Sequence, residues 1–159
     1  MCYQVYRILY SNSTNDRGKL NKSGGMGMRE EIRTGTLCMI QYKTGRYIAE
    51  FVEKSQNNNT KAIVKIISVM DHPQQGDLHH PYQVDVPIFH QRKASAFMEH
   101  ILLPIDMIQI YTGEVVDYQF SLANALQRQL QALADKDDAW SDKAREQLLL
   151  LSQEYGLSS

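Results

Sequence analysis

The hydrophobic and polar positions of the chain follow a β period in its central part and a helical period near its end. Three apolar segments, over residues 36–43, 47–53 and 61–70, are separated by short polar turns, and the last is rich in β-branched residues. This pattern predicts three strands joined as an antiparallel meander. Further along, leucines recur every three or four positions, which predicts α-helices over 118–134 and 139–155.

Local signals mark the ends of several of these elements. Thr44 and Gly45 predict a tight turn with a positive φ between the first two strands. Asp117 stands where it can cap the first helix. Gly156 is expected to end the second helix in the left-handed conformation.

The segment before the helices predicts how the strands close. Residues 92–103 read as a fourth strand ending at Pro104, residues 105–108 as a single helical turn, and residues 109–111 as a short last strand. This succession is the usual ending of an SH3-like barrel. We therefore expect a mainly β plus α fold: a small SH3-like antiparallel β-barrel over 34–111, followed by a C-terminal two-helix extension over 112–159.

A long irregular loop over residues 71–91 interrupts the strands. Its sequence, DHPQQGDLHHPYQVDVPIFHQ, contains three prolines and a glycine, which prevent a regular element. A loop of this length in a small domain is usually functional or packed on itself. All five histidines of the chain lie between positions 72 and 100.

Charge is unevenly distributed, although 17 basic and 18 acidic residues nearly cancel over the 159 residues. Residues 1–27 hold four basic residues and one acidic residue, 28–111 nine of each, and 112–159 four basic and eight acidic residues. This balance argues against nucleic-acid binding, and no apolar run is long enough to span a bilayer. We expect residues 1–33 to be a disordered basic leader, and Met26 or Met28 is a candidate start of the native protein.

The two cysteines, Cys2 and Cys38, do not form a CxxC pair. Buried or incidental thiols in a reducing cytosol are therefore expected. Neither cysteine follows an apolar stretch, and no secretory signal is visible, so we expect a cytoplasmic protein without a lipid anchor.

The histidines and aspartates of the loop raise the question of a metal site, because imidazole and carboxylate are ligands of zinc and manganese. The spacing does not favour one, since the adjacent His79 and His80 point in opposite directions on extended backbone. The alternative is that these side chains satisfy backbone groups of the loop. No nucleophile elbow, reactive-cysteine signature or phosphate-binding glycine loop is present. The sequence thus predicts no enzyme, no metal and no cofactor; a metal-dependent protein and a nucleic-acid-binding barrel remain as alternatives.

Aromatic side chains give the better case for function. In SH3-type barrels such rings, with neighbouring polar groups, bind extended peptides, although about half of those in so small a barrel should pack its core. We predict a partner-binding site that combines barrel aromatics with residues of the loop. Its candidates are Tyr42, Tyr47, Asp77, His79, His80, Pro81, Tyr82, Phe89 and His90.

Several segments together resemble a known family. They are YKTGRYIAE at 42–50, HPQQGDLHHP at 72–81 with Asp85-Val86-Pro87 beyond it, and YTGEVVDY at 111–118 leading into the two helices. On these residues the chain resembles the kinase-associated protein B family of spore-forming Bacillus relatives, over about residues 32–157.

The resemblance implies both a fold and a role. The family has an SH3-like barrel followed by a helical extension, as predicted above. It implies an accessory protein needed for the activity of a membrane sensor histidine kinase, which feeds the phosphorelay that initiates sporulation. The expected partner is therefore that kinase, with a homodimer as a further association, and the membrane is reached only through the kinase. The family supplies no catalytic residues.

Overall fold

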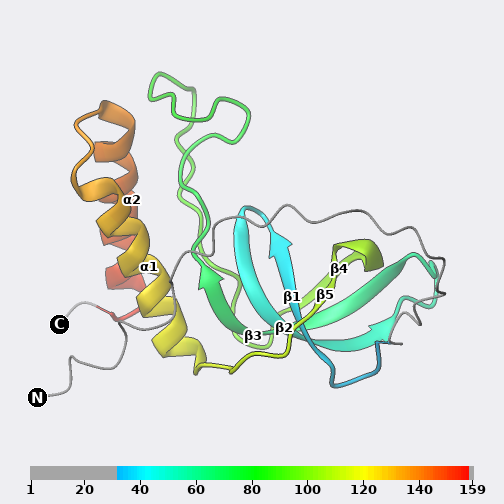
Figure 1. Cartoon of the computed structure of the whole chain (residues 1–159). Helices are drawn as coiled ribbons and strands as arrows, with labels where there is room; N and C mark the ends of the chain where they lie inside the picture. Colours follow the sequence, from blue (N-terminus) through cyan, green and yellow to red (C-terminus); the bar gives the residue numbers. More distant parts are fainter. Residues whose placement is uncertain (1–31, 158–159) are drawn as a thin grey trace, which may run out of the picture. The chain divides into compact units, whose positions relative to one another are not determined.

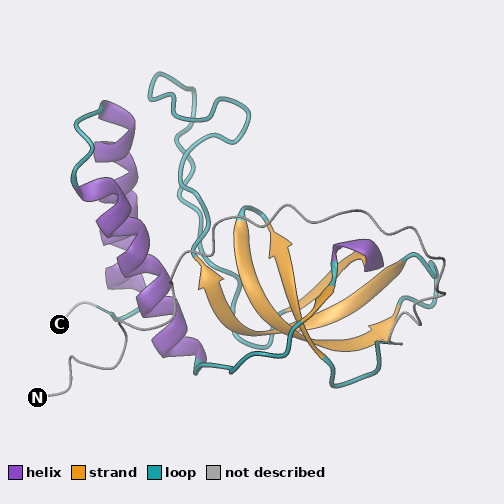
Figure 2. Cartoon of the chain, viewed as in Figure 1, coloured by secondary structure: helices purple, strands orange, loops and turns teal. Residues whose placement is uncertain are grey.

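The computed structural model describes residues 32–157. Nearly all of the predicted leader, with Cys2, Met26 and Met28, lies outside the described residues. The chain forms five strands, a short 3-10 helix and two α-helices, in the order β1 (Leu37–Tyr42), β2 (Gly45–Lys54), β3 (Lys61–Asp71), β4 (His100–Pro104), η1 (Ile105–Met107), β5 (Gln109–Ile110), α1 (Tyr118–Ala134) and α2 (Ala139–Glu154) (Figures 1 and 2).

The strands form one antiparallel sheet in the order β4-β3-β2-β1-β5. The predicted meander of the first three strands is confirmed, and so are the helical turn and the short last strand. The predicted closed barrel is not confirmed. The sheet is strongly bent (Figure 2), but β4 and β5 are its two edges, and no pairing joins them within residues 32–157.

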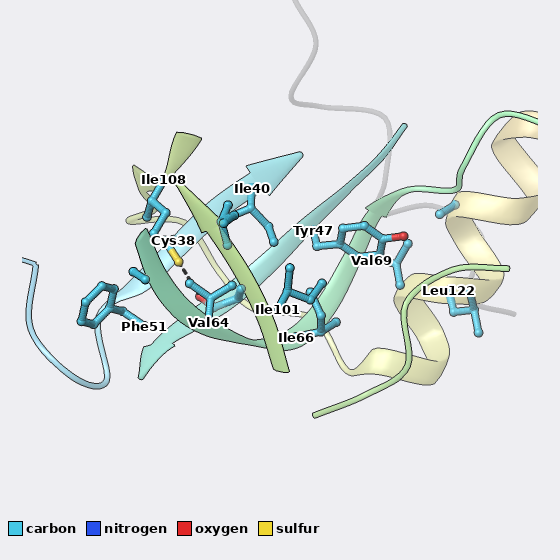
Figure 3. Close-up of a cluster of buried hydrophobic side chains, with 14 residues drawn as sticks. Cys38, Ile40, Tyr47, Phe51, Val64, Ile66, Val69, Ile101, Ile108 and Leu122 are labelled. Atoms are coloured by element: carbon cyan, nitrogen blue, oxygen red, sulfur yellow. Dashed lines mark hydrogen bonds between the residues drawn. The ribbon is translucent and has the colours of Figure 1, made fainter. Parts of the chain in front are cut away.

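The core lies on the concave face of the sheet (Figure 3). In β2, the buried side chains of Tyr47, Ala49 and Phe51 belong to this core, as the β period predicts, and Ile48 between them is buried as well. Cys38 is fully buried in the same core, and its thiol donates to the carbonyl oxygen of Ala49 at 3.3 Å. Burial raises the pKa of the Cys38 thiol to about 11. This cysteine is therefore the buried, protonated thiol that the sequence predicts.

The turn between β1 and β2 differs from the prediction in which residues take a positive φ. Lys43 (φ 46°) and Thr44 (φ 69°) do so, whereas Gly45 does not. Two successive positive φ values give the backbone twist that fits a two-residue hairpin. Gly45 is needed for another reason. A Cβ atom there would lie 2.4 Å from the hydroxyl of Tyr47, whose ring covers this position.

The fourth strand is shorter than predicted. It begins at His100, and residues 92–99 do not belong to it. Just before it, Met98 adopts a φ of 65°, and the N–H of Glu99 donates to the carbonyl oxygen of Ala96. Met98 and Glu99 still exchange backbone hydrogen bonds with Ile66 of β3, but the turn departs from extended geometry, so the regular ladder begins only at His100.

Both predicted helices are confirmed, with α2 ending one residue early at Glu154. Asp117 caps α1 by accepting from the N–H of Phe120, as predicted, and Gly156 follows α2 with a φ of 68°. Helix α1 packs on the sheet through Leu122 and Ala125, which belong to the same core as the strands. Neither helix of the described part has the length and the apolar run that a bilayer span requires.

The alternation of buried and exposed side chains in β4 predicts that alanine substitutions at two neighbouring leucines affect stability very unequally. Leu103 is 4% exposed and Leu102 is 53% exposed. Leu103→Ala should lower the free energy of unfolding by about 2–5 kcal/mol, because it leaves a cavity in the core. Leu102→Ala, the matched control, should change it by less than about 1 kcal/mol. Urea denaturation followed by circular dichroism measures both, and equal losses would contradict this register.

Candidate functional site

The loop between β3 and β4, over residues 72–99, rises from the sheet beside the two helices (Figure 1). Its two arms are joined by the side chain of Gln75, which is 1% exposed. The Gln75 amide donates to the carbonyl oxygens of Pro73 and Arg92, both at 3.0 Å, and accepts from the Arg92 N–H at 2.9 Å. The N–H of Gly76 donates to the carbonyl oxygen of His90 at 2.9 Å. These bonds fix the base of the loop without a strand or a helix.

A second polar network ties this base to the helices through His72, which is buried. The Nδ1 atom of His72 lies 3.1 Å from the carbonyl oxygen of Pro73 and 3.0 Å from Oε1 of Gln129 in α1. Its Nε2 atom lies 3.1 Å from the hydroxyl of Tyr155, which accepts from the Ala94 N–H. Because the carbonyl oxygen of Pro73 can only accept, Nδ1 carries the proton and Nε2 accepts from the Tyr155 hydroxyl.

Burial favours the neutral form of His72. Burial lowers the pKa of His72, and its hydrogen bonds to Pro73 and Gln129 offset this only in part. The two networks account for the polar side chains at the base: across the described residues no buried side-chain nitrogen or oxygen lacks a partner. The base of the loop is therefore a satisfied polar core that joins β3, both loop arms and both helices.

Asp77 stabilises the turn at the start of the loop tip, residues 77–90. Its carboxylate accepts from the N–H of His79 and from the ring of His80, both at 2.9 Å. The bond from His80, and then that from His79, hold the pKa of Asp77 below its ordinary value. Asp77 thus shapes the turn, while the side chains of His79, His80 and Pro81 are exposed to solvent.

The far side of the tip rests on the first turn of α2, where Trp140 is the central contact. The rings of Tyr82 and Trp140 meet edge to face with centroids 5.0 Å apart. Phe89 packs on the apolar cluster that Trp140 forms with other helix residues, and the ammonium of Lys143 lies 5.1 Å from the Phe89 ring centre. Val84 joins the same cluster from the loop. The cluster consists of Leu133, Trp140, Ala144 and Leu148, with Val84, Phe89 and Leu130 packed against it.

The structure divides the predicted site residues into two groups. Seven of them lie together on the loop tip: Asp77, His79, His80, Pro81, Tyr82, Phe89 and His90. Tyr42 lies apart, half-buried at the end of β1, with the Lys43 ammonium 5.0 Å from its ring centre. Tyr47 is 1% exposed, and its hydroxyl accepts from the Ser95 N–H. Its ring is core, so Tyr47 is not available for contact with a partner.

The residues that hold the tip in place carry no pattern in the sequence that marks them. Gln75, Arg92, Trp140 and Lys143 act through contacts between segments distant in sequence, which no local pattern reveals. One signal was available: a glutamine close after a proline, as in HPQQG, is a ready source of hydrogen bonds for carbonyl groups without ladder partners.

The histidines do not gather around one point. No three His, Cys, Asp or Glu side chains in the described part of the chain are placed to hold a metal ion together. His72 is engaged in the buried network, and His100 is exposed at the start of β4.

Beside His72 lies a hollow of about 220 Å³, lined by Asp71, His72, Ala125, Arg128 and Gln129. Arg46 and Arg128 both pair with Asp71 at this hollow.

Comparisons with known proteins agree with one another. A family model described as kinase associated protein B matches residues 42–156. A protein of Bacillus subtilis (strain 168) named kinase-associated lipoprotein B is 40% identical over 124 residues, which are 78% of this chain and 94% of that protein. The crystal structure of kinase-associated protein B from Bacillus cereus superposes with a TM-score of 0.67 at 31% identity. It covers 79% of this chain and 99% of the other.

The buried state of His72 predicts a pH-dependent stability. The folded pKa of His72 lies below its unfolded value, so the unfolded chain binds a proton that the folded chain does not. Stability should be full above about pH 7.5 and fall as the pH drops through about 6.5, by at most about 1.4 kcal/mol per pH unit. Urea unfolding between about pH 8 and about pH 5 measures the slope, above the range where carboxylates titrate.

His72→Asn should flatten this slope, because an amide does not titrate, whatever it does to the absolute stability. His100→Asn is the matched control, since it removes an exposed imidazole that takes no part in the network. An unchanged slope in His72→Asn would contradict the assignment.

Proposed function

Because the chain belongs to the kinase-associated protein B family, we propose that it is a non-enzymatic accessory protein that binds a sensor histidine kinase and is required for its activity. The phosphorelay that initiates sporulation is the proposed setting. The observation that carries this proposal is the family match over residues 42–156, together with two relatives whose names contain "kinase-associated".

The proposed contact surface is the loop tip, residues 77–90. It collects exposed side chains of several kinds, among them two imidazoles, a proline and the 67% exposed ring of Tyr82. Aromatic residues are over-represented among those that carry binding energy at interfaces. The backbone beneath them is fixed by Gln75 and by the His72 network, so little conformational entropy would be lost on binding.

The proposed relation of the sheet to SH3-like barrels rests on two features. These are the strand order β4-β3-β2-β1-β5 and the 3-10 helix η1 between β4 and β5. The 3-10 helix between β4 and β5 matches the ending that the sequence predicts for such a barrel, and the strand order places the short last strand β5 beside β1. In this chain the concave face is filled by the core, which leaves the loop as the outward feature of the β part.

An accessory protein can activate a kinase only by binding the active form more tightly than the inactive form. A preformed surface suits this task, because its shape selects one arrangement of the partner instead of adapting to both. We therefore propose that the loop tip contacts a part of the kinase that differs between its active and inactive states.

We also propose that the protein acts in the cytoplasm and reaches the membrane only through the kinase. The thiol of Cys38 is fully buried and bonded to a backbone carbonyl, which argues against a lipid at this cysteine, while Cys2 lies outside the described residues. The word "lipoprotein" belongs to the name of the Bacillus subtilis relative.

The contact surface can be tested with the double variant His79→Ala/His80→Ala. The variant should bind the cytoplasmic part of the kinase about tenfold or more weakly, as expected for residues central to an interface. Asp77 would still accept from the backbone N–H at position 79, so the turn is retained. Titration calorimetry measures the affinity, and the rate of kinase autophosphorylation with and without the protein measures the activation.

His100→Ala is the matched control, because it removes an exposed imidazole from β4, outside the loop tip. Wild-type affinity for His100→Ala and loss for the double variant would support the tip as the contact. Equal affinity of all three proteins would reject the tip, and no binding of the wild-type chain would reject the kinase itself as partner.

Self-association is the second proposed interaction, and two exposed leucines on α2 favour it. Leu149 is 55% exposed and Leu150 is 43% exposed, and they are adjacent on the outer side of the helix. If this face joins two copies, Leu149→Ala/Leu150→Ala should shift the protein from dimer to monomer in sedimentation velocity. A monomeric wild-type chain at high concentration would contradict the proposal.

A further inference from the structure

We propose that Trp140 is a positioning residue, which fixes residues 77–90 against α2 so that the loop tip and the helix present one preformed surface. What this means for kinase binding rests on the proposed function. The fixing of the loop does not, and it can be measured on the free protein.

Loop residues from two places converge on this one ring. The rings of Tyr82 and Trp140 meet edge to face with centroids 5.0 Å apart, and Phe89 packs on the cluster to which Trp140 belongs. These two residues lie on opposite arms of the tip, so Trp140 holds both arms at once. Aromatic contacts of this kind are favourable beyond the area that they bury.

The backbone of Gly76 lies close to the rings of Phe89 and Trp140. It has a φ of +91°, and a Cβ atom there would lie 3.1 Å from the Phe89 ring and 3.1 Å from Nε1 of Trp140. Real Cβ contacts are rarely so short. The loop therefore approaches the indole as closely as a backbone without a side chain allows.

Trp140 itself is held firmly by the two helices. It is 6% exposed and packs with Leu133, Ala144 and Leu148 between the two helices. Asp138 caps the start of α2 just before it by accepting from the N–H of Ser141 at 2.9 Å. A ring that is fixed by the helices can fix a loop that has no regular structure of its own.

The sequence contains a single tryptophan, so intrinsic fluorescence reports on this contact directly. Phe89→Ala should shift the emission of Trp140 to longer wavelength, and should speed amide exchange over residues 77–90 about tenfold or more. The matched control is Phe97→Ala in the same loop. Phe97 packs on Tyr118, at 5.6 Å between ring centres, and Tyr118 lies about 22 Å along α1 from Leu133. This control should leave both signals unchanged.

A second pair of variants leaves all candidate contact side chains in place. Gly76→Ala places a Cβ against the two rings, whereas Gly35→Ala has a similar φ of +89° with nothing within 4 Å. Both positions have a φ that disfavours a side chain, so Gly35→Ala shows what such strain does to stability where no ring is near, and only Gly76→Ala should speed exchange of the tip. Trp140→Phe, which keeps an aromatic ring at the site, should retain the slow exchange that Trp140→Ala loses.

The affinity for the kinase then distinguishes residues that position the tip from residues that contact the kinase. If the tip is docked only a fraction of the time, the apparent affinity equals the full affinity multiplied by that docked fraction. Gly76→Ala should therefore weaken kinase binding in proportion to the loss of docked fraction that exchange measures, while His79→Ala/His80→Ala weakens binding with slow exchange retained. Unchanged emission and exchange in Phe89→Ala and Gly76→Ala would overturn the role of Trp140. If the wild-type chain binds no kinase, the proposed function fails, and the measurements on the free protein still decide whether Trp140 fixes the loop.

Discussion

The backbone groups at the base of the long loop must be hydrogen-bonded without a sheet or a helix, and the rest of the site depends on how the side chains achieve this. The prolines that prevent regular structure leave carbonyl groups without ladder partners, and Pro73 is the clearest case. Its oxygen receives bonds from Gln75, Gln129 and His72. A buried carbonyl with three neighbours from different segments acts as a junction, at which the loop, the end of β3 and α1 are held together.

From that junction outward, the molecule is arranged in order of increasing exposure. The polar base is buried, the aromatic contact on α2 is partly buried, and the histidine turn at the tip is exposed. Each level restricts the next one, because the base fixes both arms and the aromatic contact then fixes the tip. The helical extension is therefore part of the same functional unit as the sheet, since it supplies Gln129 and Tyr155 to the base and Trp140 to the tip.

Much of the fold could be predicted from the sequence, because the strands and helices are encoded in local periodicity. The three strands from residue 37 to residue 71, the turn η1 and both helices lie where the hydrophobic pattern places them. The start of β4 could not be predicted, because it depends on the positive φ of Met98, which no residue preference announces. Closure of the barrel, which the structure does not confirm, is a global property that the succession of strand, turn and short strand does not determine.

For the candidate site, the sequence predicted where it lies along the chain but not which of its residues are buried. The unusual composition of the loop marked it out, but His72 and Gln75 look the same in sequence as His79 and Gln83. The two buried residues differ from the two exposed ones in that they contact segments far along the chain. Tyr47 shows the same limit: an aromatic residue beside a turn is equally compatible with a binding surface and with a core.

The hydrogen bond between His72 and Tyr155 joins residues 83 positions apart, and this has a consequence for synthesis on the ribosome. The first four strands need nothing beyond Pro104 to pair with one another. The base of the loop needs the last turn of α2. A nascent chain can therefore assemble most of its sheet well before the loop has its anchors. The proposed kinase-binding surface is then the last part of the molecule to mature, and a prematurely ended chain would carry a sheet without a positioned loop.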